Sequence, residues 1–261
     1  MPSASKSSKL NRQESLFQYV LQVGDNALIN GQRLSEWCGH GPVLEQDIAI
    51  TNIALDQVGQ ARSWLQYAAE LEGKGRSEDD LAYLRPEFEY RNVLLLEQPN
   101  TDWAYTIVRQ FLFDVFNYHL HSELKKSTDA GVAAIAEKSH KEITYHLRYS
   151  SEWMIRLGDG TELSHQKMQS ALDDLWMYSG ELTEMNELDA AMAKEGIGPD
   201  LEAIKPQYDA RVEAILSQAT LKKPEASFVQ TGGKSGRHTE YMGFILAEMQ
   251  SLQRQMPGLK W

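Results

Sequence analysis

Four long segments with helical periodicity constrain the fold of this chain more than any other feature. Apolar residues recur every three or four positions in them, whereas the valine, isoleucine and threonine alternation that is typical of strands is nearly absent. Glycine or proline clusters at 39–42, 73–75 and 158–160 interrupt the pattern, since neither residue readily continues a helix. The predicted helices cover residues 16–37, 43–71, 101–126 and 129–157.

The connections between these helices predict the fold class. Pro86 and Pro99 break the pattern within 77–100, so we expect an irregular crossover there. Two antiparallel helix pairs joined by a long crossover form a ferritin-like four-helix bundle. We therefore predict an all-α, single ferritin-like domain over residues 16–261, preceded by a disordered tail at 1–15. Additional C-terminal helices are expected at 164–186, 188–194, 206–219 and 239–255.

The helix expected at 101–126 is rich in aromatic residues between Trp103 and Tyr118. One buried helix stripe does not accommodate that many large side chains. We expect some of them to face another protein chain, because an exposed apolar helix face is common at obligate interfaces.

One half of a possible metal site lies in the helix at 129–157. Carboxylate-bridged di-iron bundles take Glu-x-x-His from each of two helices and a single Glu from each of the other two. Glu142 begins such a motif, but Tyr145 occupies the position of the histidine. His146 is still close enough on the helix to approach Glu142.

The other half of the motif contains no imidazole. Asp56 is the best candidate carboxylate in the second helix, with Gly59 at the histidine position and no histidine within a helical turn. Asp25 and Asp114 are the matching single carboxylates of the first and third helices, at similar spacings in the two halves. These acids suit either a vestigial metal site or buried carboxylates that protein groups neutralise.

Neutralising groups are expected near these carboxylates, since a buried charge without a partner costs several kcal/mol. Tyr145 and His146 are close to Glu142 in the sequence, and Arg62 is within reach of Asp56. We therefore expect Asp56 and Glu142 to point into the bundle and contact protein groups. His119 and His121 are interpreted as structural, because an i, i+2 spacing separates them around the helix.

The segment 232–240 is the best candidate for a working surface. Its glycines permit close backbone approach, and Lys234, Arg237 and His238 concentrate positive charge. It is predicted either to contact a partner subunit or a phosphate of coenzyme A, or only to cap the last helix with Thr239 as N-cap.

Composition limits the classes of partner. The net charge of −11 argues against nucleic acid, whose binding depends on clustered lysine and arginine. No apolar run approaches the roughly 18 residues that span a bilayer, and the first fifteen residues lack the apolar centre of a signal peptide. With Cys38 as its single cysteine, the chain is expected to be cytoplasmic, without a disulfide or a membrane partner.

Five strings together resemble one family, the C subunits of the bacterial phenylacetyl-CoA 1,2-epoxidase. The similarity extends over nearly everything after the predicted tail, and the strings at 97–100 and 231–240 are the most specific. The strings are LSEWCGH at 34–40, DQVGQAR at 56–62, EQPN at 97–100, GDGT at 158–161 and TGGKSGRHTE at 231–240.

This resemblance implies a ferritin-like, non-catalytic scaffold that pairs with a homologous catalytic A subunit. The A subunit would hold the di-iron centre, and a reductase subunit with FAD and an iron–sulfur centre would supply electrons from NADPH. The complex would epoxidise the aromatic ring of phenylacetyl-CoA in phenylacetate degradation. This chain itself would carry no cofactor and no catalytic residue, and could form a homodimer when isolated.

Two other functions remain open from the sequence. The chain could be an autonomous di-metal oxygenase acting on an aromatic CoA thioester through Asp25, Asp56, Asp114, Glu142 and His146. It could also be an independent acyl-CoA-binding module. Metal content of the isolated chain separates the first from a scaffold, and titration with a CoA ester separates the second.

Overall fold

The computed structural model describes residues 12–225 and 228–259, and within these ranges every regular element is a helix. The prediction of an all-α, ferritin-like fold is confirmed. The elements in chain order are α1 (Arg12–Ser35), α2 (Leu44–Glu72), α3 (Glu78–Tyr83), η1 (Glu87–Glu89), η2 (Leu94–Glu97), α4 (Trp103–Leu124), α5 (Ala130–Gly158), α6 (Glu162–Thr183), α7 (Glu187–Lys194), α8 (Leu201–Gln218), η3 (Gly233–Ser235) and α9 (Glu240–Gln255).

Helices α1 and α8 begin well before their predicted starts at residues 16 and 206. Helix α1 starts at Arg12 and buries Ser15, so residues 12–15 belong to the bundle and not to a tail. Residues 1–11 of the expected tail lie outside the described residues. Helix α8 starts at Leu201 because the side chain of Asp200 caps it by accepting a hydrogen bond from the Glu202 amide. Pro206, the expected start, lies inside the helix.

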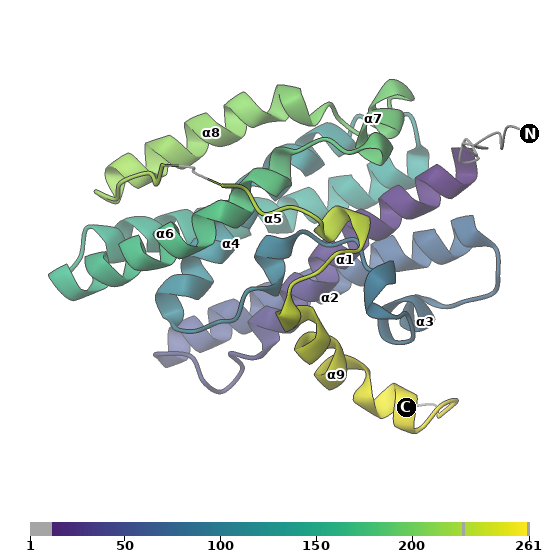
Figure 1. Ribbon diagram of the computed structural model, residues 1–261, viewed down its shortest axis with the longest axis horizontal. Helices are drawn as coiled ribbons and strands as arrows, with labels where there is room; N and C mark the ends of the chain where they lie inside the picture. Colours follow the sequence, from purple (N-terminus) through teal and green to yellow (C-terminus); the bar gives the residue numbers. More distant parts are fainter. Residues whose placement is uncertain (1–11, 226–227, 260–261) are drawn as a thin grey trace, which may run out of the picture.

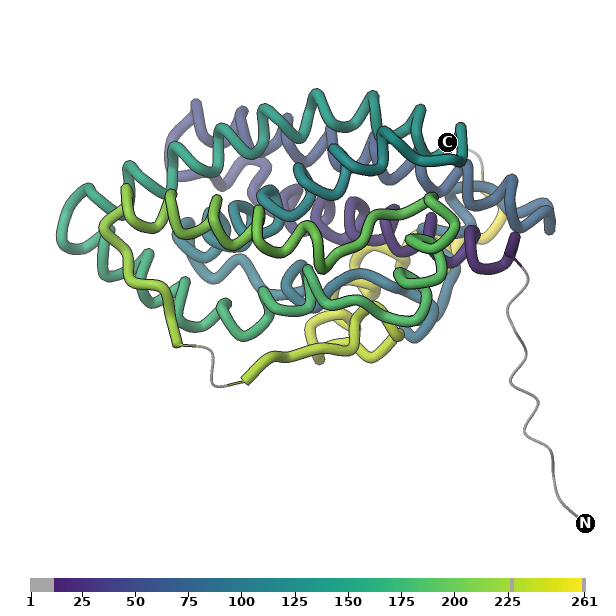
Figure 2. Tube along the Cα trace, turned by 90° about the horizontal axis from the view of Figure 1, so that it is seen from above, coloured from purple at the N-terminus to yellow at the C-terminus, as the bar shows by residue number. Residues whose placement is uncertain are grey.

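Helix α1 lies at the centre of the molecule (Figure 1). It packs along α2, while α4 packs along α5, and α2 also contacts α5. The crossover 73–102 and helices α7 and α9 cover the remaining sides of α1. Helices α6 and α8 lie over α4 and α5, as the view from above also shows (Figure 2). Other parts of the same chain therefore cover α1 and α4, whereas α2 packs mainly against α1, α3 and α5.

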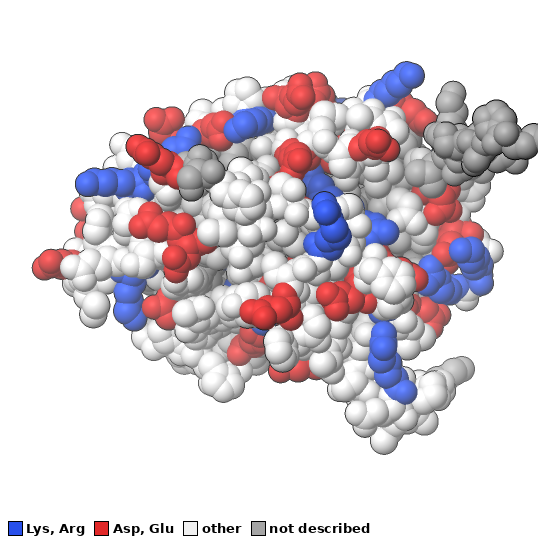
Figure 3. Space-filling model, in the orientation of Figure 1, with Lys and Arg blue, Asp and Glu red and all other residues white. Residues whose placement is uncertain are grey.

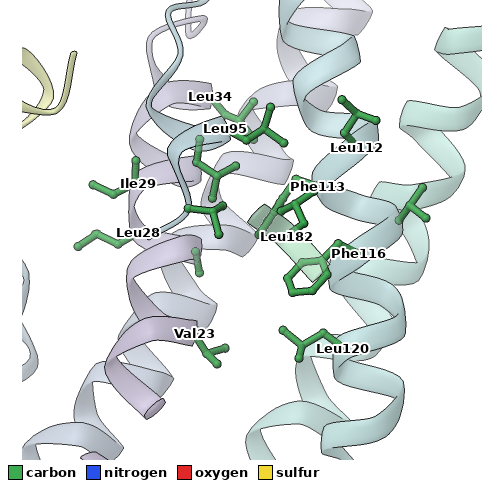
Figure 4. Close-up of a cluster of buried hydrophobic side chains, with 14 of the residues drawn as sticks. Val23, Leu28, Ile29, Leu34, Leu95, Leu112, Phe113, Phe116, Leu120 and Leu182 are labelled. Atoms are coloured by element: carbon green, nitrogen blue, oxygen red, sulfur yellow. The ribbon is translucent and has the colours of Figure 1, made fainter. Parts of the chain in front are cut away.

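The hydrophobic core lies between α1, α4 and their covering elements (Figure 4). Phe113 and Phe116 of α4 lie near Leu182 of α6 in this cluster, whereas Leu28 points to the side of α1 away from α4. The phenylalanines of α4 are at most 3% exposed, because α6 and α8 cover the side of α4 that the four-helix bundle leaves open. The phenylalanines are therefore not among the side chains expected to face another chain, whereas Trp103, Tyr105 and Tyr118 are partly exposed.

Charge on the outside is mixed. On the face of the described residues in Figure 3, acidic and basic side chains are interspersed and do not gather into one basic area. Within the part of the chain that the structure describes, no helix is long and apolar enough to cross a membrane.

A buried ion pair joins the crossover to α1. The guanidinium of Arg85 binds both carboxylate oxygens of Asp25, and the backbone amide of Arg91 donates to the same carboxylate at 2.9 Å. Both side chains are almost fully buried, and Arg85 also lies over the ring of Tyr90. Asp25 therefore faces the crossover, and not the centre of the bundle where its assignment as a vestigial metal position would place it.

Replacing Arg85 with methionine should lower the free energy of unfolding by about 3–5 kcal/mol, because Asp25 would stay buried without its cation. Denaturant unfolding of the purified variant measures this loss. Lys205→Met is the matched control, since Lys205 pairs with Asp209 on the surface. It should change stability by no more than about 0.5 kcal/mol. Equal losses in the two variants would contradict a structural role for the buried pair.

Candidate functional site

The centre of the four-helix bundle contains a chain of buried polar side chains from all four helices. Asn30 of α1 donates to the amide oxygen of Gln110 at 3.1 Å, and Gln110 of α4 donates to Asp114 at 2.7 Å. Ser150 of α5 donates to the second oxygen of Asp114, also at 2.7 Å. Each of these side chains is fully buried. In di-iron bundles of this architecture, inward side chains at the bundle centre hold the metal ions.

His146 of α5 lies near Asp114 and links this helix to α2. Its Nε2 lies 2.9 Å from Asp56 and its Nδ1 lies 3.4 Å from the amide nitrogen of Gln57. Since an amide nitrogen only donates, one assignment satisfies both contacts: Nδ1 accepts from Gln57 and Nε2–H donates to Asp56. The ring is fully buried, whereas 39% of the Asp56 side chain is exposed. The imidazole is thus fixed by hydrogen bonds on both sides.

Glu142 and Asp56 lie at the rim of the bundle and not in its centre. Both are partly exposed and line a pocket of about 100 Å³ between α2 and α5. Gln60 donates to Glu142 at 2.9 Å, the role that was expected of Tyr145 or His146. Both carboxylates therefore bind protein groups, as expected. Burial inside the bundle was also expected, but neither carboxylate is buried there.

Other expected positions lie away from this network. Gly59 and Tyr145 are exposed on α2 and α5. Arg62, expected beside Asp56, instead binds Glu78 at the start of α3. Sequence reasoning missed the neutral members of the network, although Gln110 precedes Asp114 by one helical turn and Ser150 follows His146 by one. The missed residues are Asn30, Gln57, Gln60, Gln110 and Ser150.

Burial controls the protonation of Asp114. It raises the pKa of this carboxyl to about 7, although the nearby His146 and the hydrogen bonds from Ser150 and Gln110 favour the ionised form. At neutral pH the side chain is therefore divided between its protonated and ionised states. A protonated carboxyl can donate as well as accept, which suits a network built mostly of amides and hydroxyls.

The donor set does not fit a binuclear metal centre. Two irons in such a bundle take a carboxylate from each of four helices and two imidazoles. Here the inward groups of α1 and α2 are the neutral amides of Asn30 and Gln57, and His146 is the one imidazole in the network. Within residues 12–225 and 228–259, no three histidine, cysteine, aspartate or glutamate side chains lie close enough together to hold a metal ion.

The glycine-rich segment 232–240 is held against the crossover by two buried glutamates. Glu181 of α6 accepts the backbone amides of Leu94 and Gly232 at 2.7 and 2.8 Å. Gly233 lies so close to the crossover that an added Cβ would be 2.1 Å from the carbonyl oxygen of Asn92. Burial raises the pKa of Glu181, and the backbone amides offset part of this shift.

Glu97 of the crossover binds the end of the same segment. One of its oxygens lies 2.7 Å from Nδ1 of His238, and the other accepts both the amide and the hydroxyl of Thr239 at 2.7 Å. Burial alone would lower the pKa of His238, but the hydrogen bond and charge of Glu97 outweigh it and raise the pKa. Thr239 is the N-cap residue of α9 as expected, but its hydroxyl binds Glu97 and not the helix.

For two cations of the segment, this placement argues against the first of the two expected roles, contact with a partner or a phosphate. Lys234 is buried and binds the carbonyl of Glu184 at 2.7 Å and the carboxylate of Asp189 at 3.2 Å. The side chain of His238 is also fully buried. Neither can reach a partner subunit or a CoA phosphate while these contacts persist. Arg237 is exposed, so it alone of the three faces solvent.

The fold and its polar centre define an all-α, ferritin-like protein whose bundle is held by hydrogen-bonded amides, a hydroxyl and an imidazole. A model of the phenylacetic acid catabolic protein family matches residues 1–261, and the chain belongs to that family. It is also 49% identical over 246 residues to the C subunit of the 1,2-phenylacetyl-CoA epoxidase of Escherichia coli (strain K12). The alignment covers 94% of this chain and 99% of the relative. The resemblance found in the sequence motifs is confirmed.

Replacing Asp114 with asparagine should stabilise the protein at pH 8 but not at pH 4. The folded-state pKa of Asp114 is raised, so ionisation in the unfolded state favours unfolding as the pH rises from about 4 to about 7. Asparagine removes this penalty, which is on the order of 1 to 3 kcal/mol. Denaturant unfolding of both proteins at pH 4, 6 and 8 measures the effect. A pH-independent difference would contradict the raised pKa.

Proposed function

We propose that this chain is a non-catalytic structural subunit of a phenylacetyl-CoA 1,2-epoxidase, and that it pairs with and stabilises the catalytic A subunit. The relative's name supplies the reaction and the kind of subunit. The observation that carries the proposal is the polar network at the bundle centre. Amides of Asn30, Gln57 and Gln110 occupy inward positions where a di-iron protein needs carboxylates and histidines.

The network suits a supporting role. Hydrogen bonds from four helices to Asp114, His146 and their neighbours hold the bundle in one arrangement without a metal ion. A rigid subunit packed against a homologous bundle would fix the helices that carry the partner's iron ligands, and precise metal chemistry depends on such support. In this proposal the di-iron centre belongs to the A subunit, and FAD, the iron–sulfur centre and NADPH act through the reductase subunit.

An exposed apolar stripe on α2 supports pairing with another subunit. Leu44, Ile48, Leu55 and Val58 are between 42% and 71% exposed, although α2 belongs to the bundle. Leu44, Ile48 and Leu55 follow the i, i+4, i+11 spacing of one helix face. Exposed apolar side chains on one helix face are common at protein interfaces. We assign the A subunit to this face, with a second copy of the chain as its substitute when the chain is isolated.

Iron analysis after co-expression with the A subunit tests the proposed division of roles. Size-exclusion chromatography should yield a complex whose iron follows the amount of A subunit, because this chain lacks a second imidazole-bearing half-site. The chain purified alone should contain only trace iron. Stoichiometric iron in the isolated chain, together with oxidation of phenylacetyl-CoA, would instead establish the autonomous oxygenase.

Charge on the α2 stripe should weaken pairing. Ile48→Glu and Leu55→Glu would each bury a carboxylate in the proposed interface, so we expect about tenfold or weaker binding of the A subunit. Leu163→Glu is the matched control, because Leu163 is 66% exposed at the start of α6, away from the stripe. Biolayer interferometry measures the three affinities. Unchanged binding in both α2 variants, with folding verified by circular dichroism, would place the interface elsewhere.

A further inference from the structure

A groove of about 790 Å³ lies between α5 and α8, and Tyr118 and His119 of α4 also line it. Figure 2 shows α8 running beside these two helices. The groove lies on a different side of α5 from the pocket formed with α2, and the two share no lining residue. Neither the polar network nor the glycine-rich segment uses it.

The groove exists because the facing side of α8 is small. Ala210 and Ala214 lie one turn apart on that side and leave space above Leu147 and Ile155 of α5. The aromatic rings of Tyr118 and Tyr145 also line the groove. The wall is therefore largely apolar and aromatic, as in many sites for organic ligands.

Three cations line the same groove in an otherwise acidic protein. Lys141 and Arg148 of α5 and Arg211 of α8 are exposed, and none forms an ion pair with a residue that the structure describes. Among the described residues of the lining, Glu152 is the one acidic side chain. Arg148 lies over the ring of Tyr145, with 5.6 Å between the guanidinium carbon and the ring centre. The groove therefore combines positive charge with an aromatic ring on the same wall.

Two polar groups complete the lining. Ser151 is 5% exposed, and its hydroxyl has no hydrogen-bond partner among the described residues. A buried hydroxyl normally has one, so this oxygen is suited to a ligand. Burial and the charge of Arg211 lower the pKa of His119, although Glu123 acts in the opposite direction. The His119 ring is therefore neutral at pH 7 and adds no charge.

We propose that this groove binds an organic phosphate that carries a flat ring system, a class that includes nucleotides and the phosphoadenosine part of coenzyme A. Arg148 and Arg211 bind the phosphate, since guanidinium groups match phosphate oxygens in bidentate geometry. The ring stacks against the tyrosines and the apolar wall, and the Ser151 hydroxyl hydrogen-bonds a polar atom of the ligand. This site is independent of the proposed structural role.

Calorimetric titration of the purified full-length chain tests the site with three probes: CoA, ATP and inorganic pyrophosphate. CoA or ATP should bind, and pyrophosphate should bind more weakly because it has no ring. If CoA binds and ATP does not, the ligand is coenzyme A or one of its esters. If ATP binds, the ligand is a nucleotide. Absence of binding by CoA and ATP at millimolar concentration overturns the proposal, as does equal affinity for all three probes.

Two variants locate the binding. The double variant Arg148→Ala/Arg211→Ala should weaken binding about tenfold or more, because it removes the charge-assisted hydrogen bonds to the phosphate. Ala214→Trp should weaken binding by filling the groove while leaving both arginines in place. Arg156→Ala is the matched control, since Arg156 is a cation of α5 outside the lining.

The control should bind as the unmodified chain does, and circular dichroism verifies that each variant is folded. Unchanged affinity in both the double variant and Ala214→Trp overturns the proposal. In a further outcome, the chain binds none of the probes and the double variant loses affinity for the A subunit. The groove is then a protein interface, and the proposal is overturned.

Discussion

Burial of carboxylates is the constraint on which the rest of this structure depends. An ionised carboxylate without a partner inside a protein costs several kcal/mol, yet Asp25, Glu97, Asp114 and Glu181 are all fully or almost fully buried. Asp25 is compensated by a guanidinium, Glu181 by backbone amides, and Glu97 by an imidazole and an N-cap threonine. For Asp114, burial instead raises the pKa of the carboxyl to about 7. Each solution joins elements that are distant in the sequence.

The bundle centre shows how a ferritin-like framework persists with polar side chains at inward positions. Amide side chains both donate and accept, so Asn30, Gln57 and Gln110 can link helices without charge. A metal centre would instead need side chains at those positions that bind an ion, such as carboxylates or neutral imidazoles. The network found here links the four helices through hydrogen bonds between side chains.

Sequence reasoning predicted the helices well because glycine and proline clusters interrupt strong apolar periodicity. It erred at the starts of α1 and α8, where the N-cap Asp200 outweighed Pro206 as a start signal. In the site, it identified Asp114 and His146 through their chemical type. It overlooked Gln57 and Gln110, since amides carry no motif, and it misjudged Lys234, whose acidic partner Asp189 is 45 residues away in the chain. Contacts between such distant segments are not encoded in local spacing.

The attachment of the C-terminal segment to the crossover has a consequence for biosynthesis. Glu97 meets His238 and Thr239 across 141 and 142 residues, so its partners leave the ribosome long after the four bundle helices. Until then the nascent bundle contains a carboxylate without its cap, and α1 is uncovered on the side that α9 later closes. Vectorial synthesis therefore leaves the last helix to complete the fold, in keeping with the slow closure of long-range contacts.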